Sequence, residues 1–264
     1  MMQVRFLPAA AAEDAAYAAG FDLVLCNSEL RPEKEMEYVW SLIEKRVDGI
    51  LLHQIRQLNS QQQQEVEDAG IPIVLLNRPP GKSRFSTVLV DNVRGGMLAG
   101  EYLGRLGHRK VAHLTSRMPQ GNHAVRMKGF REGLQSIDTK IRPLIIKGLQ
   151  TFRGGYEMGR KLLEAAPDMT AVFAGNDSIA FGVMRALLEA GLRIPDDVSL
   201  IGFDNVELSA ITHPPLTTIE QPTYSLGKAA VEIVLRLRED KTAPPEHRTF
   251  GVRLIERESC RALS

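Results

Sequence analysis

The sequence is poor in cysteine, in net charge and in long apolar runs, and each shortage excludes a class of protein. Its two cysteines, Cys26 and Cys260, lie far apart and outside any CxxC pattern. They indicate reduced, buried thiols rather than a disulfide framework. A net charge of +1 leaves no electrostatic footprint for nucleic acid or for an acidic membrane surface. No apolar run approaches the roughly 18 residues that span a bilayer, so we expect no membrane partner.

Catalytic and metal-binding motifs are also missing. The chain contains no GxSxG elbow, P-loop, GxGxxG fingerprint or HExxH pair. Its six histidines form no pair at metal-ligand spacing on one helix face. Cys26 has no base nearby, and no second carboxylate is locally paired with Asp204 for acid/base chemistry. We therefore expect no catalytic residues, no metal and no cofactor, although an enzyme stays open as an alternative because a sequence does not show spatial clusters.

The first residues, MMQVRFLPAAAAED, carry Arg5 and an alanine-rich patch, as a secretory leader would. Their apolar part is short, is interrupted by Pro8 and merges into an alanine-rich helix. The segment therefore does not meet the criteria for a leader, and we expect a cytoplasmic protein.

The rest of the chain is organised around residues 170–204. Ala171 to Ala174 is an apolar run, and Asn176 is placed to cap the helix that follows. Gly191 ends that helix, and Val198 to Phe203 is a second apolar run. This strand–helix–strand pattern predicts parallel neighbouring strands with a right-handed connection.

Similar units repeat along the chain. We expect further strands at Phe21–Cys26, Gly49–His53, Pro72–Leu76, Thr87–Asp91, Lys110–Leu114, Leu144–Ile146 and within Arg248–Arg257. We expect helices at Pro8–Ala19, Pro32–Glu44, Asn59–Ala69, Val93–Leu106, His123–Ser136, Gly155–Ala165 and Thr223–Arg238. Such alternation predicts an α/β fold with parallel sheets that are covered by helices on both faces.

Many of these strands end on a side chain that forms hydrogen bonds. The set comprises Asn27, His53, Asn77, Asp91, Thr115, Asn176 and Asp204. Polar residues often simply begin loops, but ligands in open parallel sheets bind beyond the carboxyl ends of the strands. The whole set predicts a polar cleft for a small, hydroxyl-rich molecule.

The longest motif, GNDSIAFGVMRALLEAGLRIPDDVSLIGFDN followed by HPPLTTIEQP, resembles the effector-binding core of LacI/GalR-type transcriptional regulators. The resemblance extends through DLVLCNS, RVDGILLH, GIPIVLLNRP, VLVDNVRGG, YLGRLGHRKVAHL, RMKGF and RLIERES. It implies a periplasmic-binding-protein-like fold of two doubly wound α/β lobes joined by crossover strands. One lobe would take residues 1–107 and 221–247, and the other 108–220 and 248–264.

The family implies a homodimer that binds a sugar or nucleoside-like effector between its lobes, so that lobe closure changes the affinity for operator DNA. Arg126, in VRMKGF, resembles the arginine that reaches into the cleft, and Asp204, in IGFDN, the acid that faces it. Together they would clamp adjacent hydroxyl groups. The other implied ligand contacts are Asn122, Asn176, Gln221, His53 and Gln150. Many relatives have an aromatic residue at the position of Gln150, and the nearby Phe152 and Tyr156 have the spacing of core residues.

The sequence departs from the family at its start. No helix-turn-helix signature precedes Glu13, so the operator would be reached only through an N-terminal domain that this sequence does not show. We expect the strand that precedes the first helix in relatives to be missing as well. A sugar-binding protein of a transport system is the alternative interpretation, since it shares the architecture.

Overall fold

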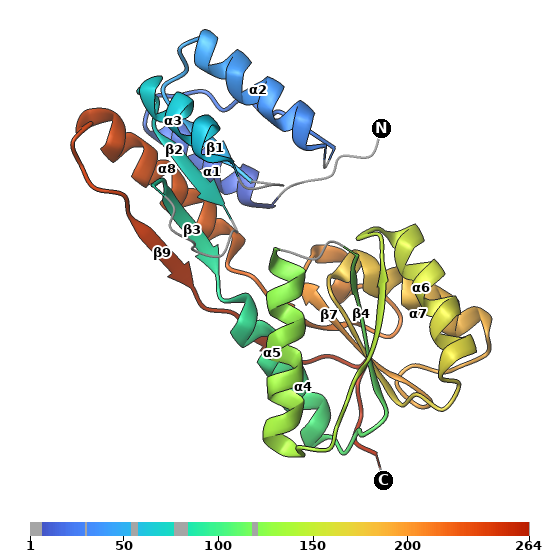
Figure 1. Ribbon diagram of the computed structural model, residues 1–264. Coiled ribbons are helices and arrows are strands. Elements are labelled where there is room, and N and C mark those ends of the chain that lie inside the picture. Colours follow the sequence, from blue (N-terminus) through green and yellow to red (C-terminus); the bar gives the residue numbers. More distant parts are fainter. Residues whose placement is uncertain (1–6, 30, 54–57, 77–83, 118–120, 264) are drawn as a thin grey trace. The chain divides into compact units, whose positions relative to one another are not determined.

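The computed structural model describes residues 7–29, 31–53, 58–76, 84–117 and 121–263 (Figure 1). The chain divides into two compact units. Unit 1 comprises Met1–Val90 and Pro222–Phe250, and unit 2 comprises Asp91–Gln221 and Gly251–Ser264.

Unit 1 is a four-stranded parallel sheet with helices on both faces. Its elements are α1 (Leu7–Ala18), α2 (Pro32–Glu44), β1 (Ile50–Leu52), α3 (Ser60–Asp68), β2 (Ile73–Leu76), β3 (Ser86–Val90), α8 (Thr223–Glu239) and β9 (His247–Phe250), in the strand order β1-β2-β3-β9. Ile50 and Leu52 pack in one core cluster with Val39 of α2, whereas Leu51 packs on the other face with Val231 of α8. This alternation is the period of two that a strand covered on both faces requires.

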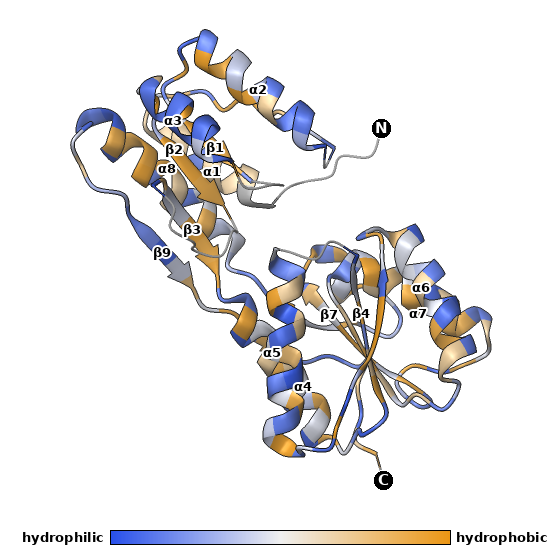
Figure 2. Cartoon of the chain, in the orientation of Figure 1, coloured by the Kyte–Doolittle hydropathy of each residue, from blue (hydrophilic) through white to orange (hydrophobic). Residues whose placement is uncertain are grey.

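Unit 2 is a six-stranded sheet with the order β10-β8-β7-β6-β4-β5. Its elements are α4 (Asn92–Arg105), β4 (Val111–Ser116), α5 (Asn122–Ile137), β5 (Leu144–Gly148), α6 (Phe152–Ala165), β6 (Ala171–Ala174), α7 (Asp177–Glu189), β7 (Ser199–Asp204), the 3-10 helix η1 (Glu207–Ala210), β8 (Thr217–Glu220) and β10 (Arg253–Ile255). All neighbours are parallel except β10, which runs antiparallel to β8. Figure 2 shows hydrophobic residues in this sheet, and β4 and β7 are buried along nearly their whole length.

The two faces of this sheet bury separate cores. Val172 and Leu200 pack in a cluster with Leu162 and Val183, on the side of α6 and α7. Phe173 and Phe203 pack with Phe130 of α5, on the side of α4 and α5. The predicted fold class, α/β with parallel sheets covered on both faces, is confirmed.

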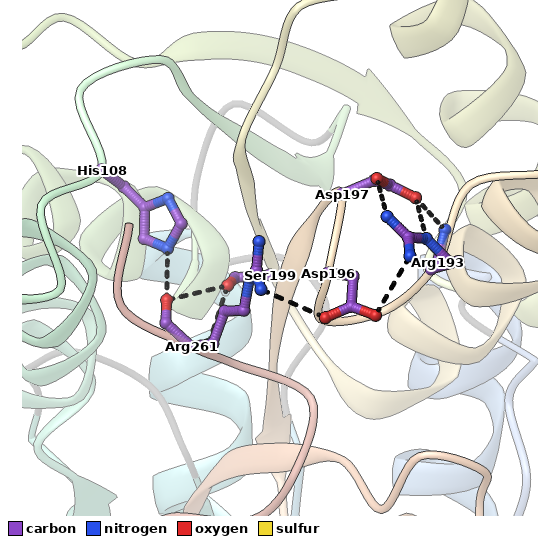
Figure 3. A network of polar contacts seen from close by, with 6 residues as sticks. All are labelled: His108, Arg193, Asp196, Asp197, Ser199 and Arg261. Carbon is purple, nitrogen blue, oxygen red and sulfur yellow. Dashed lines mark hydrogen bonds and ion pairs between the residues drawn. The ribbon is translucent and has the colours of Figure 1, made fainter. Parts of the chain in front are cut away.

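A polar network fastens the C-terminal segment to unit 2 (Figure 3). His108 Nε2 lies 3.1 Å from the carbonyl oxygen of Arg261, whose backbone N–H donates to Ser199 Oγ at 3.1 Å. The Arg261 guanidinium pairs with Asp196 at 3.2 Å, and Asp196 also pairs with Arg193. His108 is buried, and burial lowers its pKa, so the network holds a neutral imidazole at neutral pH.

Three sequence predictions are wrong. Residues 21–28 form no strand, and Val24 and Leu25 are 72% and 67% exposed. Cys26, predicted to be buried, is exposed. An apolar run becomes a strand only when a neighbouring strand bonds its backbone, and among the described residues β1 is bonded to β2 alone. Phe152, predicted to be a core residue, is half exposed because it occupies the first position of α6.

Two further differences concern an unpredicted strand and the limits of the two units. Strand β8 was not predicted, since Thr217–Glu220 is short and rich in threonine. Helix α4 and Gln221, predicted in the first lobe, belong to unit 2, and residues 248–250, predicted in the second lobe, belong to unit 1 as part of β9. The reason for α4 is its close packing on α5, because a Cβ added at Gly129 would lie 2.0 Å from the carbonyl oxygen of Val93. Only glycine lets the two backbones approach so closely.

Candidate functional site

The carboxyl ends of five parallel strands meet at one edge of the unit 2 sheet. β5, β4, β6, β7 and β8 all run in the same direction, so the segments that follow them share this edge. Gln150, Asn176, Asp204 and Gln221 lie at or just beyond these strand ends. Asn176 and Asp204 belong to the strand ends that the sequence analysis named, and both lie at this edge.

Arg126 is the buried cation of this edge. It lies on α5 with only 5% of its side chain exposed. Its Nε donates to Asn92 Oδ1 at 2.6 Å, and its Nη1 donates to the carbonyl oxygen of Gly175 at 2.6 Å. The guanidinium lies over the Phe203 ring, with Cζ 3.6 Å from the centroid. Burial lowers the pKa of Arg126 to about 10, so the group stays charged at neutral pH.

Asp204, the last residue of β7, is the acid beside this cation. Its Oδ1 lies 3.9 Å from Arg126 Nη2 and accepts a hydrogen bond from Gln221 Nε2 at 2.5 Å. Its side chain is 28% exposed, whereas that of Arg126 is almost covered. Burial raises the pKa of Asp204, and the Arg126 charge and the Gln221 bond oppose that rise. Both groups belong to unit 2, so the pair forms within one unit.

Asp177 is a second carboxyl close to the pair. It is the first residue of α7 and is fully buried. Its Oδ1 accepts from the hydroxyl of Thr218 at 2.7 Å, and its Oδ2 accepts from the backbone N–H of Val206 at 2.9 Å. Burial, followed by the charge of Asp204, raises the pKa of Asp177. A buried carboxyl with two such donors fixes the loops from which it accepts.

Two buried histidines lie under the same edge. His123 of α5 is 3.3 Å from Thr115 Oγ1, and burial together with the Arg126 charge lowers its pKa to about 3. His113 of β4 is stacked on Phe173, and burial lowers its pKa to about 4. Both rings are therefore neutral at neutral pH and leave Arg126 as the cation of this region.

The other predicted residues have distinct positions. Asn176 caps α7, since its Oδ1 accepts from the backbone N–H of Ile179 at 2.8 Å. Asn122 begins α5, one turn before Arg126. Gln150 donates to Ser116 Oγ at 3.0 Å and is partly buried. His53 follows β1 in unit 1 and is exposed there. Asn77, one of the predicted strand ends, lies outside the described residues.

Sequence reasoning missed Asn92, Phe203 and the role of Asp177. Asn92 and Phe203 support the Arg126 guanidinium, but neither lies close to it in sequence. Asp177 was recognised only as part of a helix start, because its bonds to Val206 and Thr218 span 29 and 41 residues. A local pattern carries no signal for contacts of that range.

Among the described residues, no group of three or more histidine, cysteine or acidic side chains could hold a metal ion. Within the same residues, no helix combines the length and apolar character needed to traverse a lipid bilayer.

Comparison with known proteins identifies the family. The periplasmic binding protein-like domain matches residues 101–260. The HTH-type transcriptional repressor PurR of Vibrio atlanticus (strain LGP32) is 34% identical over 255 residues, which cover 96% of this chain and 76% of the relative.

Solved structures agree with this relationship. A LacI family transcriptional regulator from Enterococcus faecium with bound ribose is 31% identical, with a TM-score of 0.89 over 98% of this chain and 94% of that one. The lac repressor dimer bound to operator and the anti-inducer ONPF is 26% identical, with a TM-score of 0.85 over 99% and 91%. These relatives are regulators and support that interpretation rather than the transport alternative. The chain belongs to the LacI family of transcriptional regulators and corresponds to their periplasmic-binding-protein-like, effector-binding domain.

Proposed function

We propose that this domain binds a small sugar at the carboxyl edge of the unit 2 sheet, and that binding changes the DNA affinity of a helix-turn-helix domain. The observation that carries the proposal is the pair of Arg126 and Asp204. Arg126 is fixed by Asn92 and Gly175, and its Nη2 points to an acid that is partly open to solvent. A guanidinium donor beside a carboxylate acceptor matches adjacent hydroxyl groups, each of which donates and accepts.

Gln221 adds a second argument for a polar ligand. Its Nε2 bonds Asp204, whereas its Oε1 is buried and has no hydrogen-bond partner in the described part of the chain. A buried acceptor without a donor costs about 1–3 kcal/mol, which a ligand hydroxyl would offset. Asn122, Asn176, Gln150 and His53 are proposed as further ligand contacts.

Ribose is the first effector to test, because a relative of 31% identity has been solved with ribose bound. A thermal-shift screen would compare ribose with other pentoses, hexoses, sugar phosphates and nucleosides. At a ligand concentration of about 100 Kd, binding stabilises the folded state by about 2.7 kcal/mol, which is a readily measured shift. The absence of any shift across this panel would reject the proposed ligand class.

Site variants then test the pair itself. We expect Asp204→Asn and Arg126→Gln to weaken the affinity for the ligand identified by the screen at least about tenfold, because each removes a charge-assisted bond of about 1.5–3 kcal/mol. Asp197→Asn and Arg153→Gln serve as matched controls, since both residues lie in exposed ion pairs. His53→Ala tests the contribution of unit 1. Unchanged calorimetric affinity in both site variants would refute the assignment.

We also propose that the domain dimerises. Ile211 and Leu208 are 74% and 48% exposed in the segment that follows β7. Exposed apolar side chains that gather in one segment are typical of an interface between proteins. A relative solved as a dimer on operator DNA supports this function. We propose a cytoplasmic location on the same ground.

Sedimentation tests the interface. Ile211→Glu should shift the protein to monomer, whereas Leu188→Glu, a change of the same kind at a 48% exposed leucine of α7, should not. A dimer that survives Ile211→Glu would contradict this interface. In a protein that carries the DNA-binding domain, effector coupling of about 1–3 kcal/mol would change operator affinity about 5- to 150-fold.

A further inference from the structure

The turn after β7 has an unusual backbone. Asp204 has a φ of 119° and Asn205 a φ of 55°, and neither residue is glycine. Positive φ is uncommon for residues with a side chain; asparagine and aspartate adopt it more often than others, mostly at φ of about 50–70°, and Asp204 lies outside that range. A residue in such a sparsely populated region costs of order 1–3 kcal/mol and persists only where the surroundings enforce it. The carboxylate of Asp204 is therefore aimed by whatever holds this turn.

Asp177 holds the backbone of the turn directly. Its Oδ2 accepts from the N–H of Val206, two residues after Asp204. Its Oδ1 accepts from the hydroxyl of Thr218 in β8, and Gln221 is the residue directly after that strand. The carboxylate also lies against β7 itself, because a Cβ added at Gly202 would be 2.1 Å from Asp177 Oδ1. One buried side chain thus joins the start of α7, the turn after β7 and strand β8.

Neighbouring contacts hold the side chain of Asn205 instead. Its Nδ2 donates to Glu220 Oε1 at 2.9 Å, and its Oδ1 accepts from Arg257 Nη2 at 2.7 Å. These bonds hold the side chain of Asn205, whereas the backbone N–H of Val206 donates to Asp177. The two sets of contacts therefore have separable roles.

We propose that Asp177 is a positioning residue for effector recognition, which uses its two hydrogen bonds to hold the β7 turn so that Asp204 faces Arg126 and Gln221. The inference rests on the proposed function of this edge and adds to it a residue that need not touch the ligand. It differs from two simpler roles, in which the negative charge of Asp177 would serve the N-terminus of α7 or the Arg126 cation.

Asparagine separates hydrogen bonding from charge at this position. In Asp177→Asn the amide oxygen accepts from Val206 N–H, and the amide nitrogen donates to Thr218 Oγ1, because a hydroxyl also accepts. The variant keeps the bonds to Val206 and Thr218 and loses the charge, whereas Asp177→Ala loses these two bonds together with the hydrogen bond from the backbone of Phe203.

Ribose affinity, measured by calorimetry, is the first readout. We expect Asp177→Ala to weaken it at least about tenfold and Asp177→Asn to stay within about threefold of the wild type, because loss of both bonds releases the turn. Asp168→Ala, at an exposed acid paired with Lys110, is the control and should bind as the wild type does. Wild-type affinity in Asp177→Ala overturns the inference. Equal losses in the alanine and asparagine variants also overturn it, because they assign the effect to charge.

A second readout needs no ligand. The side-chain amide of Gln221, followed by NMR, reports its bond to Asp204. It should shift in Asp177→Ala and keep its wild-type position in Asp177→Asn. If the wild type binds none of the sugars, the proposed function fails and this resonance alone decides the inference, with an unchanged signal in the alanine variant as the refuting result. Should Asp177→Ala not fold, Thr218→Val removes one of the two bonds and should produce a smaller shift in the same direction.

Discussion

Two apolar runs of this chain look alike in sequence and have opposite structures. FDLVLC, residues 21–26, follows a helix in unit 1, and AVFA, residues 171–174, follows a helix in unit 2. The second run is strand β6, fully buried between β4 and β7. The first forms no strand, and Val24 and Leu25 are mostly exposed. Apolar composition therefore marks a segment that is able to form a strand, and a neighbouring strand that bonds its backbone decides whether it does.

The largest expected effect comes from removing a side chain of the buried run. Phe173 is fully buried and lies 4.9 Å from Phe130, centroid to centroid. Phe173→Ala should lower the free energy of unfolding of unit 2 by about 3–5 kcal/mol, because it leaves a cavity in the core. Val24→Ala should change the stability of unit 1 by less than about 0.5 kcal/mol. Hydrogen exchange in urea, read peptide by peptide, measures both. Similar losses in the two variants would contradict the comparison.

The second-largest effect is expected from acid, because protonation of His113 should lower the free energy of unfolding of unit 2. The imidazole stacks on Phe173, 4.7 Å between centroids, and its pKa is about 4 in the folded state against about 6.5 in an unfolded chain. The unfolded state therefore binds the proton more tightly, and stability falls as the pH drops below about 6.5. Between pH 7 and pH 4 this linkage removes about 3 kcal/mol, because each pKa unit is worth 1.36 kcal/mol and most of the shift of about 2.5 units has taken effect by pH 4. His113→Phe should lose less stability over the same pH range. An equal loss in the variant would assign the acid sensitivity to other groups.

A smaller effect is expected where α5 crosses α4, above the face of the sheet that carries Phe173. A Cβ added at Gly129 would meet the carbonyl oxygen of Val93 at 2.0 Å, so the helices must separate. Gly129→Ala should cost about 1–3 kcal/mol of unit 2 stability by overpacking. Gly251→Ala is the control, since a Cβ there meets nothing within 4 Å. Tolerance of alanine at both positions would show that the helix crossing is looser than described.

The smallest perturbation is chemical and leaves the fold intact. Cys26 is exposed in the first run, whereas burial raises the pKa of Cys260 to about 12. Because the thiolate is the nucleophile, a maleimide should label Cys26 well before Cys260 at neutral pH. Peptide mass spectrometry gives the order of labelling. Earlier modification of Cys260 would mean that the segment around residue 26 is covered.

Much of the candidate site was accessible from local patterns. Asn176 and Asp204 were identified because each follows an apolar run, and parallel strands bring such ends to one edge. Arg126 was identified only from the family resemblance, since a lone arginine on a helix usually reads as an exposed cation. Its near-complete burial depends on Phe203 and Asn92, which are 77 and 34 residues away. No periodicity or spacing rule connects positions so far apart.

The sequence by itself determined the alternation of helices and strands, the α/β class with parallel sheets and the family. It could do so because caps, breakers and apolar periods act within a few residues. Tertiary structure alone decided that residues 21–28 stay outside the sheet, that α4 packs with unit 2, and that Asp177 holds the turn bearing Asp204. Each of these depends on a partner more than 25 residues away or on the absence of one among the described strands. Such partners decide whether backbone groups pair in a sheet and which hydrogen bonds and pKa a buried carboxyl has.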